Sequence, residues 1–585
     1  LKVEWSPVSH LIKHVNDEEL YEIKLETGRR IRVTASHSIF TLNERGIVSV
    51  PTSELKEGDY IVTIKNFDVP NIRVINLLEL IDEKYFKKTN IMVENVGKRI
   101  FKEIRKCPRI YKRRKVFYKI GNKMIRSDYL LKLERENRIS GSLIKCLNLE
   151  KCVNKKASFV SYFHGKKFKI PVYIKNLKTF AFVLGWFVAE GSTNYRKILF
   201  DLGYKEEKEA RLIVKAIQKL FNLEAKIKKE KSKLRIYFSS SLLSYFLRKY
   251  VGGRAREKEI PFFVFHFPSD ARRIFIKSLI KGDGHVSKKK NFVIFATASK
   301  DLALELHYLL LLENVFSSIT FVRSINEGSL PTLKKKWYRF YRVWIFGEEM
   351  KKLGYKVNNC EGIMAEKLPT FLLKKLGYTN VLKNSRIGRE KFEEFLKIGY
   401  SKNKEMYLTI LQSHQSQDFD RYYLNYLQSK GFIDSNLDVT EFGREIVNYI
   451  NFLKRLIHSD LCFLKIKKIK RLKLKRKEYV YDISVPGREN FVCSSGIVCH
   501  NSVGTQGIGA KGAILYAQLT TGKPAKISTY YNGKEYEFEM MIDVLKNEPK
   551  VISQNVKDTN KKHGLKVELL VEGRYVEKGQ SIPTY

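Results

Sequence analysis

FAFVLGWFVAEGS at residues 180–192 and IFIKSLIKGDGH at residues 274–285 are two stretches built in the same way. Each is an apolar run of helical length that ends in an acidic residue followed by glycine. The two acids, Glu190 and Asp283, lie 93 residues apart. Either run alone is typical of a buried core helix. Their repetition indicates an internal duplication.

The segments around the two runs repeat as well. The matching pairs are strand 197–202 with strand 291–297, helix 206–221 with helix 300–312, strand 234–238 with strand 337–345, and helix 241–250 with helix 348–353. The same order at a near-constant offset predicts a pseudo-twofold α+β domain.

This pair of segments resembles a two-motif LAGLIDADG homing endonuclease, a class commonly nested inside inteins. The resemblance implies that the two helices pack through small residues such as Gly185 and Ser278, which brings Glu190 and Asp283 together beneath the DNA. Two converging carboxylates repel each other unless a divalent cation lies between them, so we expect Mg²⁺ held by both acids to activate water for strand cleavage. Lys258 resembles the lysine-containing block of the family and would stabilise charge at the scissile phosphate. Both motifs depart from the family consensus in their apolar halves.

The outer parts of the chain have a different character. A predicted hairpin with strands 21–25 and 30–34 leads into Thr34-Ala35-Ser36-His37-Ser38-Ile39-Phe40, and a predicted strand at 479–485 precedes Gly496-Ile497-Val498-Cys499-His500-Asn501-Ser502. Together these motifs resemble the splicing (Hint) domain of an intein, over roughly residues 1–66 and 462–502.

The resemblance assigns a role to each motif residue. Thr34 and His37 belong to the motif that polarises the upstream scissile amide. Ser502, the first residue of the host, supplies the hydroxyl for transesterification. Asn501 releases the host by closing its side-chain amide onto its own carbonyl as a succinimide. His37 and His500 supply protons near neutral pH.

Three further residues qualify this interpretation. Asp482 would orient groups between the two junctions. Cys499 is interpreted as a small buried strand residue. The alternatives are a nucleophile or, with Cys493 and His500, part of a zinc ligand set. Glu489 stands where many inteins have a histidine. We expect the first-step nucleophile, a Cys or Ser, to lie several tens of residues upstream of Leu1.

The segment after the junction resembles the ATPase subunit of archaeal topoisomerase VI, through its glycine-rich start, His563–Glu568 and Glu572–Tyr575. The resemblance implies part of a GHKL-type ATP site, with ATP and Mg²⁺ as cofactors of the spliced host and the A subunit of topoisomerase VI as its partner. Glycines at the start of a helix let backbone N–H groups approach phosphates. The expected phosphate-binding residues are Gly504, Gln506, Gly507 and Gly509. We expect the unspliced precursor to lack ATPase activity, because the insertion interrupts this loop.

Composition supports a nucleic-acid partner for the middle of the chain. The 585 residues carry a formal charge of +48 from 110 Lys+Arg and 62 Asp+Glu. Residues 1–70 hold nine basic and eleven acidic side chains and residues 502–585 hold twelve and nine, so residues 71–501 carry +47. We therefore expect a nucleic-acid partner, and the endonuclease resemblance implies that it is double-stranded DNA. No apolar run approaches the roughly 20 residues of a membrane span, and the seven cysteines include no CxxC pair. A cytoplasmic protein with no membrane partner is expected.

Two stretches of the basic middle have their own patterns. Residues 98–125 interleave basic and aromatic side chains, which favours a DNA contact over a solvated face. Residues 401–452 are weakly similar to a winged-helix module.

The sequence thus predicts a multidomain chain: a β-rich Hint domain split around an α+β pseudo-twofold LAGLIDADG endonuclease, followed by an α+β GHKL ATPase fragment. The expected segments are 1–70 and 461–501 for the splicing domain, 71–175 for a basic DNA-binding extension, 176–355 for the endonuclease, 356–460 for a helical, winged-helix-like DNA-binding region, and 502–585 for the host. The expected function is self-excision at Asn501/Ser502 with Mg²⁺-dependent, site-specific double-strand DNA cleavage. The alternative is a splicing-only intein with a DNA-binding remnant, the activity being that of the ATP-hydrolysing topoisomerase host.

Overall fold

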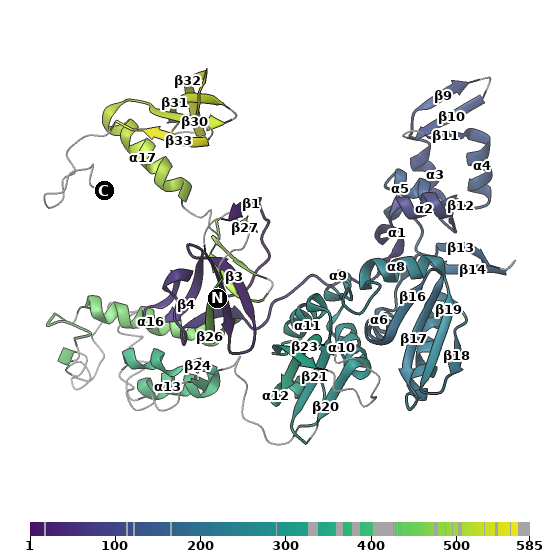
Figure 1. The fold of residues 1–585 in the computed structure, drawn as a ribbon, viewed down its shortest axis with the longest axis horizontal. Helices are drawn as coiled ribbons and strands as arrows, with labels where there is room; N and C mark the ends of the chain where they lie inside the picture. The colour runs from purple at the N-terminus through teal and green to yellow at the C-terminus, as the bar shows by residue number, and fades with distance from the viewer. Residues whose placement is uncertain are drawn as a thin grey trace.

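The computed structural model describes residues 1–570 apart from 17–18, 113–114, 121–122, 164–165, 288, 326–336, 358–366, 377–385, 402–424, 426–427, 430, 437, 439, 473–477, 486, 494, 501–505, 532, 544–547 and 562. Within these residues, no helix combines the length and the apolar character needed to cross a membrane. Figure 1 shows several folded units joined along the chain.

Strands from both ends of the first 500 residues build one sheet, in the order β28-β29-β4-β6-β26-β2-β3 with β5 paired to β4. Their bounds are β2 Leu20–Leu25, β3 Arg30–Thr34, β4 Ser38–Asn43, β5 Gly46–Pro51, β6 Tyr60–Ile64, β26 Leu461–Leu472, β28 Asn490–Val492 and β29 Val498–His500. The long strand β26 joins the two halves, because Ile469 pairs with Ile23 of β2 and Leu464 pairs with Ile61 of β6. The two sequence segments expected to form a splicing domain are therefore neighbours in one β-rich unit.

Local chemistry explains the strands at its edge. In β2 the apolar residues Ile23 and Leu25 are fully buried while Lys24 between them is not, as expected for a sheet with one covered face. The predicted hairpin of β2 and β3 is confirmed, and its turn contains Gly28 with a φ of 85°. A separate two-stranded ribbon pairs β1 (His10–Asn16) with β27 (Glu478–Ser484).

The predicted duplication is confirmed element by element. The first unit consists of α6 Leu177–Glu190, β16 Gly191–Asn194, β17 Lys197–Gly203, α7 Glu207–Phe221, β18 Lys226–Lys229, β19 Lys233–Ser239 and α8 Ser241–Val251. The second consists of α10 Ser269–Asp283, β20 Gly284–Ser287, β21 Phe292–Thr297, α11 Lys300–Leu312, β22 Ser318–Ile325, β23 Trp337–Phe346 and α12 Glu348–Lys352. The short helix α9 (Phe262–Phe265) lies between them. Their sheets have equivalent orders, β16-β17-β19-β18 and β20-β21-β23-β22.

Residues 71–175 form a module that closes on itself, because β7 (Ile75–Asn76) pairs with β15 (Tyr173–Ile174) at its two ends. Between them lie α1 Leu77–Leu80, α2 Glu83–Thr89, β8 Met92–Glu94, α3 Lys98–Ile104, β9 Arg109–Lys112, β10 Lys115–Ile120, β11 Lys123–Arg126, α4 Ser127–Arg135, β12 Arg138–Ser140, α5 Gly141–Cys146, β13 Ser158–Phe163 and β14 Lys166–Pro171. Figure 1 shows this module beyond the duplicated unit, away from the splicing sheet. Its aromatic residues have separate roles: Phe101 is core and Tyr111 is 75% exposed.

The described parts of residues 356–460 pack on the splicing sheet. The described elements are β24 Lys367–Pro369, β25 Arg386–Gly388, α13 Arg389–Ser401 and α16 Glu441–Ile457. Leu372, Phe392 and Leu453 are fully buried in one cluster with Val62 and Phe463 of the sheet. The winged-helix-like pattern predicted at 401–452 falls mostly outside the described residues and stays a prediction.

The C-terminal segment is a separate α+β unit, as expected. The predicted helix after the glycines is α17 (Gln506–Thr521). It is followed by a sheet of order β32-β31-β30-β33, with bounds β30 Ala525–Tyr531, β31 Lys534–Asp543, β32 Glu548–Asp558 and β33 His563–Glu568. Of the expected phosphate-binding residues, Gly504 lies outside the described residues, and Gln506, Gly507 and Gly509 lie in the first turn of this helix.

Candidate splice site and candidate nuclease site

The strand that leads to the expected junction is held within the splicing sheet. In β29, His500 pairs with Asn490 of β28 and Cys499 pairs with Ile39 of β4. Cys499 is 1% exposed, which confirms its interpretation as a small buried strand residue. Because side chains alternate along a strand, His500 lies on the opposite face from Cys499.

His37 lies in the loop before β4, and its backbone is fixed from one side. The carbonyl oxygen of His37 accepts hydrogen bonds from the backbone N–H of Thr52 at 2.9 Å and from its hydroxyl at 2.6 Å. The imidazole of His37 lies 6.4 Å from the Phe491 ring of β28, and that of His500 lies 5.7 Å from the Phe40 ring of β4. The two histidines therefore lie near the adjacent strands β28, β29 and β4.

Asp482 completes this group from the ribbon strand β27, where it is only 5% exposed. Burial lowers the pKa of His37, the negative charge of Asp482 raises it, and the nearby His500 lowers it again. The three side chains are thus close enough to influence one another. A mostly neutral imidazole at His37 suits a group that accepts or relays a proton near pH 7.

The remaining expected splicing residues are placed as follows. Glu489, in a left-handed turn with a φ of 52°, brings a carboxylate oxygen to 3.9 Å from Nε2 of His500. A carboxylate therefore faces His500 where the family pattern has a histidine. The hydroxyl of Thr34, at the end of β3, lies 3.4 Å from that of Ser36. Asn501 and Ser502 lie outside the described residues.

The alternative interpretation of the two nearby cysteines as zinc ligands is not supported. Among the described residues, no group of three or more His, Cys, Asp or Glu side chains is arranged to hold a metal ion. The thiols of Cys493 and Cys499 instead hydrogen bond to each other, which lowers the pKa of Cys493 to about 6 and raises that of Cys499.

The backbones of α6 and α10 approach each other closely where they cross, because glycine and serine lie at the crossing. A Cβ at Gly185 would lie 2.6 Å from the carbonyl oxygen of Phe275 and 2.7 Å from Cβ of Ser278. Near the helix ends, a Cβ at Gly282 would lie 2.5 Å from that of Ala189. The expected small-residue interface is confirmed, and backbones in such contact hold the two helix ends together.

The two acids expected at the nuclease site stand at these helix ends. Burial, and then the negative charge of Asp283, raises the pKa of Glu190 to about 7. Asp283 reaches solvent, yet the protein packed around its carboxyl raises its pKa as well, against the effect of Lys258. This electrostatic strain is what a divalent cation between two carboxylates relieves. Two carboxylates suit Mg²⁺, which keeps several waters as ligands.

Lys258 lies beside the acids, as the family resemblance implies. Its ammonium donates hydrogen bonds to the carbonyl oxygens of Val188 at 2.6 Å and Ala189 at 2.7 Å, at the end of α6. Burial lowers the pKa of Lys258, and the charges of both acids raise it. A cation held by helix-terminal carbonyls complements the negative end of the helix dipole.

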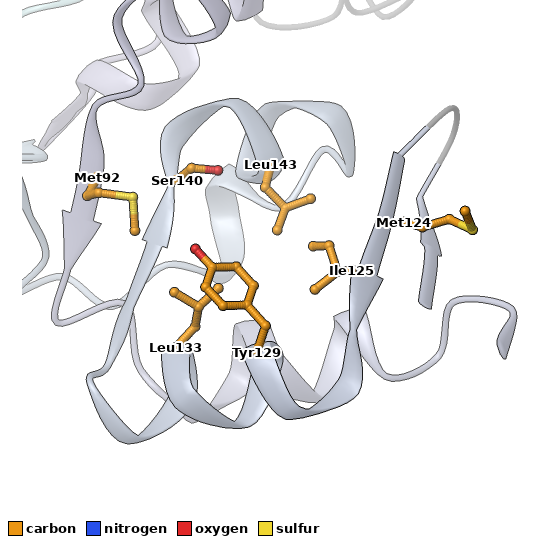
Figure 2. A pocket seen from close by; sticks show the side chains of 7 residues that line it. All are labelled: Met92, Met124, Ile125, Tyr129, Leu133, Ser140 and Leu143. Carbon is orange, nitrogen blue, oxygen red and sulfur yellow. The ribbon is translucent and has the colours of Figure 1, made fainter. Parts of the chain in front are cut away.

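A hollow of about 300 Å³ lies elsewhere, in the 71–175 module. Figure 2 shows Tyr129 and Leu133 of α4 beside Leu143 of α5 and Ile125 of β11. Its lining is mostly apolar and contains none of the expected splicing or nuclease residues.

Sequence reasoning missed one residue that touches the splice region, Tyr308 of α11. Its hydroxyl donates a hydrogen bond to the carbonyl oxygen of Cys493 and accepts one at 3.0 Å from the backbone N–H of Gly496. No local pattern marks it, because Tyr308 lies in a helix of the duplicated unit, 185 residues before Cys493.

Two known proteins match this chain over very different lengths. Over 557 residues the chain is 26% identical to the DNA-directed RNA polymerase subunit Rpo1C of Methanocaldococcus jannaschii, covering 94% of this chain and 53% of that protein. Over 87 residues it is 39% identical to the B subunit of the type 2 DNA topoisomerase 6 of Methanosarcina barkeri, covering 14% of each. The chain thus spans about half of the first relative and a small part of the second.

A solved structure of the homing endonuclease I-DmoI in complex with DNA and Mn matches 32% of this chain and 99% of its own, with a TM-score of 0.22 and 14% identity. The family model of the intein splicing domain matches residues 1–501. That span contains both halves of the β-rich sheet and the units between them, and the chain belongs to the intein splicing family.

Proposed function

We propose that this chain excises its intein at Asn501/Ser502 and that the same intein cleaves double-stranded DNA at a specific site with the help of a divalent cation. The observation that carries the proposal is the shared sheet. It places the loop with His37 beside the strand that ends at His500, although the two residues are 463 positions apart.

The C-terminal step follows from this placement. The side-chain nitrogen of Asn501 attacks its own backbone carbonyl carbon and forms a succinimide. The bond from that carbon to the nitrogen of Ser502 breaks, the leaving amine takes a proton from His500, and the proton that the Asn501 amide nitrogen loses returns to His500. Beforehand, the hydroxyl of Ser502 accepts the upstream acyl group by transesterification. Thr34, His37 and Asp482 support these steps by polarising and orienting the reacting groups.

For DNA cleavage, we propose that Glu190 and Asp283 hold Mg²⁺ at the helix crossing. The bound cation supplies activated water and stabilises charge on the leaving oxygen. Lys258, already anchored to the end of α6, contributes positive charge toward the scissile phosphate. The net charge of +47 on residues 71–501 provides the attraction for the DNA backbone. The 71–175 module, which holds 28 basic and nine acidic side chains, extends this attraction beyond the endonuclease at 176–355. The 356–460 region is proposed as a further DNA contact.

The segment 502–585 is proposed to be part of the ATPase subunit of a type II topoisomerase, which binds ATP with Mg²⁺ and works with a second subunit once spliced. Gly504, Gln506, Gly507 and Gly509 would contribute to its phosphate loop, at the start of α17. Splicing is then the step that makes this loop continuous.

Two measurements test the proposal. Mass spectrometry of the incubated chain should detect release of residues 502–585, and Asn501→Ala should abolish that release. Release that continues from the Asn501→Ala chain would contradict the assigned junction. Separately, the purified intein should cut the uninterrupted host gene only when Mg²⁺ is present. Splicing with no cleavage under these conditions would identify a DNA-binding remnant.

A further inference from the structure

The second endonuclease repeat and the splicing sheet share one core. Leu311 of α11 is fully buried and Phe316 just after it is 7% exposed, and both belong to the cluster formed by Ile23, Leu25 and Ile64 of the splicing domain. Two units that share one apolar core move as one body, whereas domains joined by a polar contact move relative to each other.

Backbone contacts make this interface close. The N–H of Ile319, in β22, donates a hydrogen bond of 2.9 Å to the carbonyl oxygen of Thr27 in the β2–β3 turn. A Cβ at Gly28 would lie 1.7 Å from the carbonyl oxygen of Ile319, so glycine alone fits there. The endonuclease is therefore packed directly against the splicing fold.

The same interface reaches the turn that precedes the splice junction. In this turn the N–H of Gly496 donates a hydrogen bond of 2.8 Å to the carbonyl oxygen of Cys493. The N–H of Cys493 donates a hydrogen bond of 3.0 Å to the carbonyl oxygen of Ile497. Gly496 is buried with a φ of 74°, and its carbonyl accepts from the N–H of Ile64 at 2.9 Å. Strand β29 starts two residues later and ends at His500.

Tyr308 reaches across the interface and joins both ends of this turn. Its hydroxyl donates to the carbonyl of Cys493 and accepts from the N–H of Gly496, as described above. Its ring is held edge-on against Phe67, with ring centroids 5.8 Å apart. From the other side, the buried guanidinium of Arg29 lies 3.1 Å from the position of a Cβ at Gly496. Side chains from both domains thus lie against the turn, and the hydrogen bonds to it come from Tyr308.

We propose that Tyr308, an endonuclease residue, is a positioning residue for the C-terminal splicing step. By fixing the Cys493–Gly496 turn, its hydroxyl sets the register of β29 and so the place of His500 relative to the scissile bond. The inference rests on the proposed cleavage at Asn501/Ser502. A helix of the nuclease thereby supports the chemistry of the splicing domain.

The substitution Tyr308→Phe tests this in the full chain, because it removes the hydroxyl and keeps the ring against Phe67. The matched control is Tyr449→Phe, which removes a hydroxyl that donates a hydrogen bond of 2.8 Å to the carbonyl oxygen of Leu372. Both residues belong to the apolar cluster on the other face of the splicing sheet. Loss of one buried hydrogen bond corresponds to about a 10-fold effect. We expect release of residues 502–585 to slow about 10-fold in Tyr308→Phe and to stay near the wild-type rate in Tyr449→Phe.

Two further readouts separate positioning from general stability. The pH dependence of release should change shape only in Tyr308→Phe, since the placement of the proton donor His500 is altered there. Hydrogen exchange of the peptide 493–500 should be faster in Tyr308→Phe, while peptides from β2 and β6 keep wild-type exchange. DNA cleavage should be unchanged in both variants.

Each outcome bears on one of the two proposals. If the wild-type chain releases nothing, the assigned junction fails, and the exchange data alone decide the role of Tyr308. Exchange of peptide 493–500 that is unchanged in Tyr308→Phe overturns the inference. Release from Tyr308→Phe at the wild-type rate also overturns it. Equal slowing of release in Tyr308→Phe and Tyr449→Phe overturns it as well.

Discussion

The substitution Gly185→Ala is the most direct test of the geometry at the nuclease site. The added Cβ would stand 2.6 Å from the carbonyl oxygen of Phe275, where an ordinary contact begins at 3.4 Å. The obstacle is backbone, which cannot rotate away, so α6 and α10 must separate by about 0.8 Å. The acids Glu190 and Asp283 sit at the ends of these two helices and must move with them.

The magnitude follows from two opposed effects. Alanine is favoured over glycine in a helix interior by about 1 kcal/mol, whereas overpacking a well-filled contact costs about 1–3 kcal/mol. The net loss of stability is therefore at most about 2 kcal/mol, and the protein stays folded. Catalytic geometry tolerates only about 0.5 Å, and a misplacement near 1 Å costs about 100-fold in rate. We expect cleavage to fall by about 10- to 100-fold.

The assay is single-turnover cleavage of the uninterrupted host gene with saturating Mg²⁺, alongside release of residues 502–585. The control is Gly253→Ala, whose Cβ would meet only the side chains of Glu257 at 3.6 Å and Arg248 at 3.7 Å. Gly185→Ala should lose cleavage and keep release, and Gly253→Ala should keep both. Wild-type cleavage in Gly185→Ala would refute the link between the glycine contact and the acids.

Three other predictions concern separate parts of the chain. Glu190→Gln or Asp283→Asn should abolish Mg²⁺-dependent cleavage and leave release intact; loss of both activities would argue against two independent sites. Burial and the nearby Arg29 hold the pKa of His307 well below 6.5. Below pH 6.5 the unfolded chain therefore binds a proton at His307 that the folded chain does not bind. The stability present above pH 6.5 is lost as the pH falls. The free energy of unfolding should therefore decrease as the pH falls below 6.5, and urea unfolding of His307→Leu should lack that part of the pH dependence; an equal pH dependence in both chains would contradict it. Replacing residues 77–172 by an Asn-Gly turn between β7 and β15 should weaken DNA binding in a mobility-shift assay and leave release unchanged, since the two strands already pair; slower release would tie the module to splicing.

Local patterns were enough to predict the duplicated unit. Helix α11 was predicted at 300–312 and lies at Lys300–Leu312, and α7 was predicted at 206–221 and lies at Glu207–Phe221. Helical periodicity is a property of neighbouring residues, so it can be read without tertiary information. The approach of Glu190 to Asp283 was expected from the family resemblance, since local patterns alone do not say which helix ends meet.

Contacts between distant segments could not be predicted in this way. Tyr308 and Gly496 are 188 residues apart, and the hydroxyl of Tyr308 looks like that of any tyrosine on a helix face. In the basic and aromatic stretch 98–125 the pattern favoured a DNA contact, which stays a prediction. It did not indicate that Phe101 packs inside the module while Tyr111 is 75% exposed. Burial depends on the surrounding fold, which composition does not specify.

Helix α11 belongs to two domains at once, and this determines which functions can be lost separately. Leu306 and Leu310 are buried in the endonuclease core, while Tyr308 and Leu311 face the splicing core. A helix covered on both sides explains why its sequence is apolar almost all round. Substitutions at the two acids remove a reacting group from the nuclease alone. A substitution at Leu311 opens a cavity next to the splicing sheet and, through the same helix, loosens the second endonuclease sheet. The proposed nuclease activity is therefore separable from splicing at its acids, but not at a fully buried position of α11 such as Leu311.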